Sequence, residues 1–361
     1  MKLLQIVLLI GALALSVNAN INLKAMFPVK EFLKARQRLQ GIAYHTPLQY
    51  MQSLSEQYDC NVYLKREDLQ IVRSYKIRGA YNKMSQTSRA LLDKGVVAAS
   101  AGNHAQGVAF SCSRLKVKCK IFMPKETPNQ KVNKVKNFGK EWVEVVLVGK
   151  NFDEAFKSAW DYMEKIGNIF VHPFDDPKII TGQGTAALEI LEDIDLPIDY
   201  LFAGIGGGGF LSGASLVFKH YSPETKIIGV EPSGAASMWL SFQLNKITAL
   251  KEMDPFVDGC AVGKPGVITF EVLKQNLEDL LVVPEGKTCT TIMQLYNNEG
   301  IVAEPAGALG ISALDYYREQ IKGKTIVVVV SGGNNDINRS EEIKRRSSEY
   351  EQKRIAEGRE Y

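Results

Sequence analysis

Seven short apolar runs, separated by helix-like segments, most constrain the fold of this chain. Several runs are apolar throughout instead of alternating with polar residues, which is typical of parallel strands covered by helices on both faces. Strands that alternate with helices predict the α/β class, with mostly parallel sheets. The runs are Asn61 to Leu64, Val96 to Ala99, Cys119 to Met123, Trp142 to Val148, Leu201 to Ile205, Ile227 to Val230 and Ile326 to Val330.

Three of these runs end directly in loops of small residues that lead into helix-like sequence. The loops are residues 100–104, 206–209 and 331–334. Because ligands of open α/β sheets bind at the carboxyl ends of the strands, all three are candidate site loops. The chain shows no internal repeat and no Pro- or Ser-rich linker, so we expect two lobes that share one cleft.

The charge balance excludes one class of partner. The 44 basic and 40 acidic residues give a net charge of +4 in 361 residues, without the clustered cationic surface typical of nucleic-acid binding. The 45% of hydrophobic residues is ordinary for a globular protein with a substantial core. We therefore expect small-molecule partners and no nucleic acid.

Lys76 is the candidate reactive amine. A lysine condenses with an aldehyde only as the neutral amine, so an enzyme must lower its pKa by burial or by a nearby cation. Arg78, two residues further on, is one such cation. Taken alone, Lys76 is equally well one of many surface lysines, and the interpretation depends on the motifs that accompany it.

The glycine run Gly206, Gly207, Gly208 and Gly209, followed by Phe210, is a candidate phosphate cradle. Without side chains, backbone N–H groups can approach an anion closely, and the following segment places a helix N-terminus beside it. A tight turn or a nucleotide loop remains an alternative, although the dinucleotide fingerprint with its later acidic partner is not cleanly present.

Ser331 offers a neutral hydroxyl at a strand end. A hydroxyl bonded to a pyridine nitrogen cannot keep the ring protonated as a carboxylate would, so the ring is a weaker electron sink and suits elimination. The alternative is a hydroxyl that caps the next turn. Lysine, glycine cradle and serine together indicate pyridoxal phosphate as the cofactor.

The loop Ser100, Ala101, Gly102, Asn103 and His104 has the small residues needed to wrap backbone donors around a substrate carboxylate. Within it, Asn103 can donate to a phenolate-type oxygen. The chain has four histidines and none is paired at metal-ligand spacing, so we interpret His104 as loop or core architecture and expect no metal.

The first 19 residues read as a secretory signal peptide. Lys2 is followed by an apolar stretch and by small residues that suit cleavage after Ala19. This predicts a secreted protein with no membrane segment once the signal is removed. The five cysteines are odd in number and lack a close pair, which is not a disulfide framework, so we interpret the rest as an intracellular type of fold with an export signal.

These motifs, in this order, resemble the threonine dehydratases (threonine ammonia-lyases) among the fold type II pyridoxal-phosphate enzymes. The similarity extends over Met26 to Ser348 and includes Leu64 to Gln70 and Glu304 to Ala308. The resemblance implies a tryptophan synthase β-like fold with two open twisted sheets flanked by helices and the cofactor between two lobes. The expected parts are a signal peptide (1–19), a large lobe (20–84 and 168–345), a small lobe (85–167) and a charged tail (346–361).

The resemblance also implies roles for the site residues. Lys76 would hold the cofactor as a Schiff base and, once released, remove the α-proton of the substrate. Asn103 would contact the phenolic oxygen, Gly206 to Phe210 the phosphate, and Ser331 the ring nitrogen. By the same analogy L-threonine would give 2-oxobutanoate and ammonia, and L-serine would give pyruvate more slowly.

Departures from related families narrow this assignment. The related serine racemases look like they carry a second serine at the position of Ala101. We therefore do not expect racemisation. Of the racemase metal-site positions only Glu231 is acidic here, with Ala235 and Ser237 following. The chain ends soon after Ser348, where biosynthetic relatives continue into an isoleucine-binding domain, so we expect no isoleucine inhibition and degradation of external threonine. The family resemblance implies a dimer or tetramer.

Two other functions stay open at this point. One is a serine dehydratase or another β-family lyase or synthase, which residues of the substrate pocket would decide. The other is a catalytically inactive secreted binding protein of the same fold. A nucleotide-binding Rossmann protein is weaker, because Lys76 and Ser331 would then be coincidences.

Overall fold

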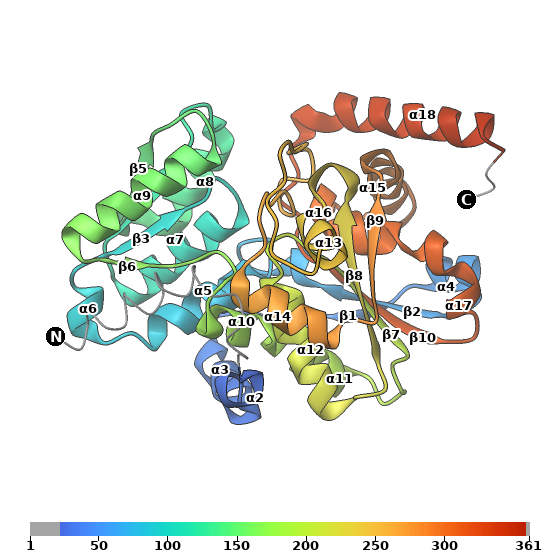
Figure 1. The fold of residues 1–361 in the computed structure, drawn as a ribbon, viewed down its shortest axis with the longest axis horizontal. Coiled ribbons are helices and arrows are strands. Elements are labelled where there is room, and N and C mark those ends of the chain that lie inside the picture. Colours follow the sequence, from blue (N-terminus) through green and yellow to red (C-terminus); the bar gives the residue numbers. More distant parts are fainter. Residues whose placement is uncertain (1–21, 359–361) are drawn as a thin grey trace.

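The computed structural model describes residues 22–358 and divides them between two lobes, each built around its own sheet (Figure 1). The larger sheet has six strands in the order β1-β2-β10-β7-β8-β9, and the smaller has four in the order β5-β4-β3-β6. Every pairing is parallel except that of β1 with β2. The predicted α/β fold with two mostly parallel sheets is confirmed, while the predicted signal peptide lies outside the described residues.

Strands from both ends of the chain form the larger sheet. At its centre, all six residues of β10 are buried, because this Val- and Ile-rich run packs on both faces. It pairs with β2 on one side and with β7 on the other. The strands are β1 (Leu48–Tyr50), β2 (Asn61–Arg66), β7 (Tyr200–Gly204), β8 (Lys226–Pro232), β9 (Asp279–Val283) and β10 (Thr325–Val330).

The smaller sheet comes from one continuous stretch of chain. Its strands are β3 (Val96–Ala99), β4 (Cys119–Met123), β5 (Val143–Leu147) and β6 (Ile169–Phe170). The expected end of the small lobe at residue 167 is wrong, because β6 pairs with β3 two residues further on. A strand of two residues is too short to give a periodic signal in the sequence.

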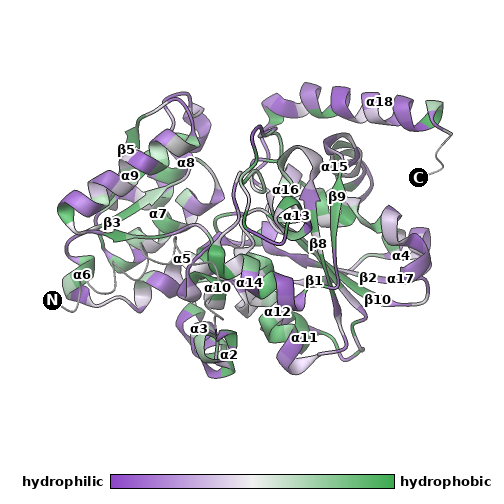
Figure 2. Cartoon of the chain, viewed as in Figure 1, coloured by the Kyte–Doolittle hydropathy of each residue, from purple (hydrophilic) through white to green (hydrophobic). Residues whose placement is uncertain are grey.

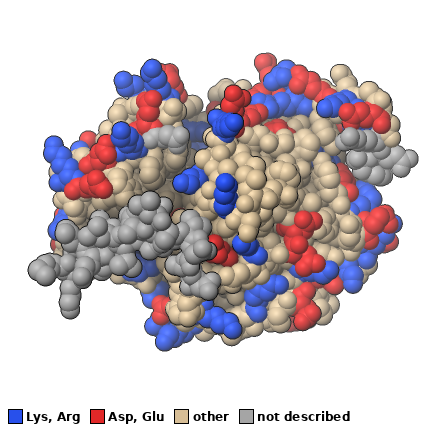
Figure 3. Space-filling view, viewed as in Figure 1, with Lys and Arg blue, Asp and Glu red and all other residues tan. Residues whose placement is uncertain are grey.

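Side chains alternate across each sheet and divide the core into layers. In β3, Val96 and Ala98 pack with the cluster that contains Val108, whereas Val97 and Ala99 pack with Ala159 on the other face. Figure 2 shows the strands as mainly hydrophobic and the outer helix faces as hydrophilic. In Figure 3, acidic and basic side chains are interspersed over the face that is shown.

Helices cover the faces of both sheets (Figure 1). Among the described residues, none is long and apolar enough to cross a bilayer. The helices are α2 (Leu23–Met26), α3 (Val29–Leu39), α4 (Gln52–Tyr58), α5 (Lys76–Ser85), α6 (Arg89–Leu92), α7 (Asn103–Leu115), α8 (Asn129–Gly139), α9 (Phe152–Ile166), α10 (Pro177–Gln183), α11 (Thr185–Asp193), α12 (Gly209–Tyr221), α13 (Ser237–Gln243), α14 (Val267–Asn276), α15 (Glu285–Glu299), α16 (Pro305–Ser312), α17 (Arg318–Ile321) and α18 (Ser340–Ala356).

The expected charged tail from residue 346 is not a separate element. Helix α18 is continuous from residue 340 to residue 356 and lies beside α15 (Figure 1). Ile343 and Ser347 are buried in this contact, and Thr290 of α15 bonds to the Ser347 hydroxyl at 2.9 Å. The expected boundary at 345/346 therefore falls inside a helix. The few apolar residues of this helix are dispersed among many charged ones, so the sequence pattern does not indicate where the helix begins.

Candidate active site

The three predicted loops and Lys76 meet between the lobes. The loops follow β3, β7 and β10, and Lys76 is the first residue of α5. Ser74, just before α5, forms an isolated bridge with Gly332 of the third loop. Asn103 of the first loop contacts Asn334 of the third, with 2.8 Å between the Asn334 Nδ2 and the Asn103 Oδ1. The structure therefore brings residues from both sheets into one site.

The Lys76 amine has the environment that imine chemistry requires. Its Nζ donates a hydrogen bond to the Pro173 carbonyl oxygen at 3.0 Å. Burial lowers the pKa of Lys76 to about 8, although the nearby Cys260 and Glu304 act in the opposite direction. A far larger fraction of this amine than of an ordinary lysine is therefore neutral near physiological pH, which makes it a nucleophile.

The expectation that Arg78 lowers the pKa of Lys76 is wrong. The Arg78 side chain is 1% exposed and pairs with Glu67 at 2.7 Å and with Glu189 at 2.6 Å. Residues two apart on a helix do not face each other, so Arg78 points away from the amine. Its charge is neutralised within the core of the larger lobe, and burial alone accounts for the shift at Lys76.

The glycine loop is shaped for an anion. Gly208 has φ +89°, a backbone conformation that disfavours other residues, and α12 begins at Gly209. Within residues 22–358, the backbone N–H groups of residues 206–211 have no hydrogen-bond acceptor. A Cβ on Gly207 would lie 2.2 Å from the ring of Phe174, so the loop has no room for a side chain. Free N–H donors at a helix N-terminus form a phosphate site.

The loop of residues 100–104 has a similar arrangement at the start of α7. The Ser100 hydroxyl accepts a hydrogen bond from the Gly102 N–H at 3.2 Å. In the described part of the chain, the N–H groups of Ala101, Asn103 and His104 find no acceptor. These donors at the positive end of a helix suit a carboxylate.

His104 is buried below this loop. Its Nε2 lies 2.8 Å from the Val171 carbonyl oxygen, and burial lowers its pKa to about 3. An imidazole that stays neutral and is held by a carbonyl has a packing role. This position agrees with its interpretation as loop or core architecture.

Ser331 is the first residue after β10 and is 8% exposed. Its hydroxyl donates to the Ala306 carbonyl oxygen at 3.1 Å. To donate to a ring nitrogen instead, the hydroxyl would have to rotate away from Ala306. The Ser331 hydroxyl therefore does not cap the turn that follows β10, because its acceptor, Ala306, lies in α16.

Glu304 is a site residue that the sequence did not predict, although the segment Glu304 to Ala308 carries part of the family resemblance. The carboxylate accepts hydrogen bonds from Asn103 Nδ2 at 2.6 Å and from the Asn334 N–H at 3.2 Å. Burial raises the pKa of Glu304 to about 7. The available signal was an acidic residue next to an apolar helix that is wholly buried.

The segment after β6 is a second part of the site that the sequence did not predict. The Nδ1 of His172 accepts hydrogen bonds from the N–H groups of Phe174 at 3.2 Å and Asp175 at 2.8 Å. Burial lowers the pKa of His172 to about 4, which keeps Nδ1 available as an acceptor. The turn that results presents the Pro173 carbonyl to Lys76.

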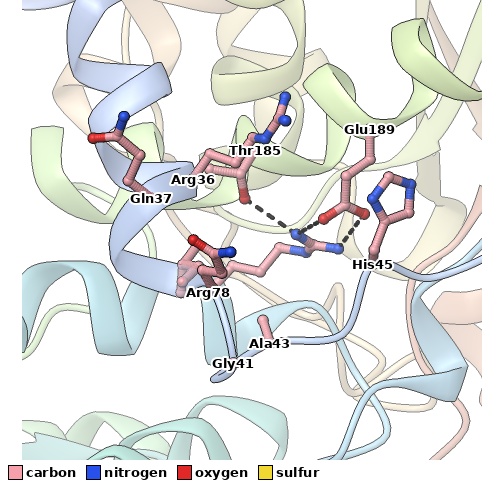
Figure 4. Close-up of a pocket in the computed structure, with 10 residues that line it drawn as sticks. Arg36, Gln37, Gly41, Ala43, His45, Arg78, Thr185 and Glu189 are labelled. Carbon is pink, nitrogen blue, oxygen red and sulfur yellow. Dashed lines mark hydrogen bonds and ion pairs between the residues drawn. The ribbon is translucent and has the colours of Figure 1, made fainter.

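A cavity of about 400 Å³ lies elsewhere, between α3, α5 and α11 (Figure 4). Its walls include Arg36, His45, Arg78 and Glu189, and none of the predicted site residues lines it. Figure 4 shows the Arg78 guanidinium bonded to Thr185 and Glu189. Because Arg78 and Glu189 are already paired with each other, the cavity is a gap beside this structural ion pair.

The racemase metal positions have a different use in this chain. The Glu231 carboxylate accepts hydrogen bonds from the N–H groups of Met238 at 2.9 Å and Trp239 at 2.7 Å. Burial raises the pKa of Glu231 to about 8. Among residues 22–358, no three His, Cys, Asp or Glu side chains are grouped as metal ligands would be.

Comparison with known proteins identifies the family. The model of a family described as "Pyridoxal-phosphate dependent enzyme" matches residues 39–332. The chain belongs to this family. The match includes Lys76, Asn103, the glycine loop and Ser331, and enzymes of the family use pyridoxal 5'-phosphate.

The chain is similar to several threonine dehydratases. The "L-threonine dehydratase biosynthetic IlvA" of Halalkalibacterium halodurans is 55% identical over 90% of this chain and 78% of its own length. Its namesake in Bacillus subtilis is 54% identical over 91% of this chain and 78% of its own length. The structure of the processed threonine deaminase isoform 2 of Solanum lycopersicum is 40% identical, covers 88% of this chain and 94% of its own, and has a TM-score of 0.83.

The residues present fit the cofactor of this family. The residues between the lobes include a buried amine of lowered pKa, a glycine loop whose N–H donors have no acceptor among residues 22–358, and a hydroxyl at the end of β10. These groups match the aldehyde, the phosphate and the ring nitrogen of pyridoxal phosphate, in that order.

Proposed function

We propose that this chain is an L-threonine dehydratase that uses pyridoxal phosphate to convert L-threonine to 2-oxobutanoate and ammonia. The observation that carries the proposal is the Lys76 amine, whose pKa is lowered to about 8 beside two loops of free N–H donors. The relatives at 54% and 55% identity support the same reaction. When bound, pyridoxal phosphate supplies an aldehyde that condenses with amines and a ring that withdraws electrons from the substrate Cα.

Each residue has a defined task in this proposal. Lys76 holds the cofactor and, once released, removes the Cα proton of the substrate. The N–H donors of Gly206 to Phe210 bind the phosphate, and those of residues 100–104 bind the substrate carboxylate. Asn103 and Ser331 bind the phenolic oxygen and the ring nitrogen.

The protein also controls where the proton goes. In the free amine, Nζ of Lys76 donates to the Pro173 carbonyl at 3.0 Å, which orients the nitrogen lone pair and limits its motion. A base whose pKa is about 8 can accept a proton and return it near neutral pH. A neutral Ser331 hydroxyl leaves the ring nitrogen unprotonated, which favours loss of the β-hydroxyl over reactions that need a long-lived carbanion.

The first test is release of 2-oxobutanoate from L-threonine by residues 20–361 with added pyridoxal phosphate. Lys76→Ala serves as the control, with Lys83→Ala, another lysine of the same helix, as the matched variant. Activity that is lost only in Lys76→Ala is the expected result. No release from wild-type protein loaded with cofactor would refute the proposal.

The substrate ranking is part of the same experiment. Pyruvate released from L-serine faster than 2-oxobutanoate from L-threonine would favour the serine dehydratase alternative. Turnover of O-acetylserine would favour a β-replacement synthase. A protein that takes up no cofactor would favour the inactive binding protein.

The proposal extends to regulation and biological role. We expect activity that does not change with isoleucine, which adding millimolar isoleucine to the assay tests. The relatives are named as biosynthetic enzymes, which favours a role in biosynthesis over the degradation expected from the leader. A dimer or tetramer remains the expected assembly, and light scattering of the purified protein tests it.

Secretion remains a proposal that depends on residues 1–19 alone. N-terminal sequencing of material from the medium should begin near Asn20. Protein that stays in the cells and keeps its first residues would contradict the proposal.

A further inference from the structure

Glu304 joins the two lobes at the cofactor site. It lies in the larger lobe immediately before α16, and its carboxylate accepts a hydrogen bond from Asn103 at the start of α7 in the smaller lobe. The distance from Asn103 Nδ2 to Glu304 Oε1 is 2.6 Å, and Glu304 is 4% exposed. A buried carboxylate with such a partner requires an explanation, because burial of a charge is costly.

Helix capping does not explain this side chain. Glu304 occupies the N-cap position of α16, yet its side chain makes no capping hydrogen bond. The backbone carbonyl of Glu304 instead receives the N–H groups of Gly307 and Ala308 at 2.8 and 3.1 Å. The start of α16 therefore does not use the carboxylate, which is directed toward Asn103 instead.

The surroundings leave a fitted space for the carboxylate. A Cβ on Gly332 would lie 2.3 Å from Glu304 Oε1, and a Cβ on Gly259 would lie 3.4 Å from the same atom. The second oxygen receives the Asn334 N–H at 3.2 Å. Glycines on two sides and a backbone donor hold the carboxylate in one position.

The Asn103 amide is consequently fixed at both ends. Its Nδ2 donates to Glu304, and its Oδ1 accepts from Asn334 Nδ2 at 2.8 Å. Above its pKa of about 7 the Glu304 carboxylate is ionised and can only accept hydrogen bonds, so the amide group that faces it there has to be the NH₂. The other N–H of that NH₂ has no acceptor within residues 22–358, and a reversed amide would present an oxygen there instead.

We infer that Glu304 is a positioning residue for the cofactor, which orients the Asn103 amide so that its second N–H can donate to the phenolic oxygen. This inference rests on the cofactor site of the proposed function. Lys134 of the smaller lobe supports the same arrangement, because its Nζ donates to Asn334 Oδ1 at 3.2 Å.

Glu304→Gln is the deciding variant, because glutamine keeps the shape but can donate as well as accept. Without an acceptor-only partner, the Asn103 amide can turn over. We expect the dissociation constant for pyridoxal phosphate to rise about tenfold or more, the range for loss of a hydrogen bond to a charged group. The absorbance spectrum of the bound cofactor and its dependence on pH should change as well. Glu304→Asp retains an acceptor-only group and should recover part of the affinity.

Glu285→Gln is the matched control, since Glu285 is also an acidic residue at a helix start in the larger lobe and contacts Ser233 and Gly234. It should bind the cofactor with the wild-type spectrum. A folded Glu304→Gln protein with wild-type affinity and spectrum would overturn the inference. If only the melting temperature falls, with the spectrum unchanged, the role is structural and the inference is also overturned.

The outcomes separate this inference from the proposed function. Wild-type protein that dehydrates threonine alongside an unaffected Glu304→Gln variant would leave the function standing and remove the positioning role. Cofactor binding that depends on Glu304 in a protein without threonine activity would support the positioning role and remove the function.

Discussion

The reactivity of Lys76 is the property of this site that can be tested most directly by varying pH. Burial lowers the pKa of its amine to about 8, from the ordinary value of 10.5. Only the neutral amine attacks an aldehyde. The rate at which cofactor-free protein captures pyridoxal phosphate should therefore follow the neutral fraction of this one amine.

The size of the effect follows from the two pKa values. At pH 7, an amine with a pKa of about 8 is neutral in about one molecule in ten, whereas an ordinary lysine is neutral in about one in 3,000. The environment of Lys76 thus makes the reactive form about 300-fold more abundant at that pH. Below pH 8 the capture rate should rise about tenfold per pH unit, and above pH 8 it should level off.

Stopped-flow absorbance measures this rate between pH 6 and pH 10. Lys76→Ala gives the background from other lysines, and a simple alkylamine in the same buffers corrects for ionisation of the aldehyde itself. Because Glu304 raises the pKa of Lys76, Glu304→Gln should move the break in the curve to lower pH. A corrected rate that still climbs between pH 9 and pH 10 would refute the argument, since the amine would then titrate as an ordinary lysine.

Three further predictions concern packing and charge. Arg78→Met removes the ion-pair partner of buried Glu67 and leaves Glu189 with Lys65 alone, so the free energy of unfolding in urea should fall by about 3–5 kcal/mol, and a loss below about 1 kcal/mol would contradict the role given to Arg78. Gly207→Ala should abolish cofactor binding in equilibrium dialysis because its Cβ would lie 2.2 Å from the Phe174 ring, whereas Gly263→Ala, with nothing within 4 Å, should bind normally. The pKa of His172 is lowered from 6.5 to about 4, so between these pH values the unfolded chain binds a proton that the folded chain does not. Stability should therefore fall by about 3 kcal/mol from this group as pH drops through that window, and urea denaturation of His172→Asn should show a shallower decline.

The sequence predicted the parts of the fold that have strong local patterns. The run Val96 to Ala99 coincides with β3, and Cys119 to Met123 coincides with β4, because both strands are apolar on two faces. The strands β1 and β6 were missed, since three and two residues are too few for a periodic signal. Strand β9 was also not among the predicted runs; it begins with the exposed Asp279 and is only partly buried.

The candidate site residues that the sequence singled out also belong to strong local patterns. Lys76, Asn103, the glycine loop and Ser331 each stand at a recognisable position beside a strand or helix, and the structure brings the loops of Asn103 and Ser331 into contact. Glu304 and His172 belong to the site only because they contact, directly or through a turn, residues that are distant in the sequence. Glu304 bonds to a residue 201 positions away, and the turn at His172 acts on Lys76. Local patterns carry no information about such contacts.

The arrangement of the larger sheet also sets an order of assembly during synthesis. Strands β3 to β6 lie between residues 96 and 170, so the smaller sheet can form as soon as that stretch has left the ribosome. Strand β2 must wait for β10, because its residues 61–66 pair with residues 325–330, which are made much later. Lys76 and Ser331 therefore come together only after β10 has been made, so the nascent chain cannot hold a cofactor through both residues before that point.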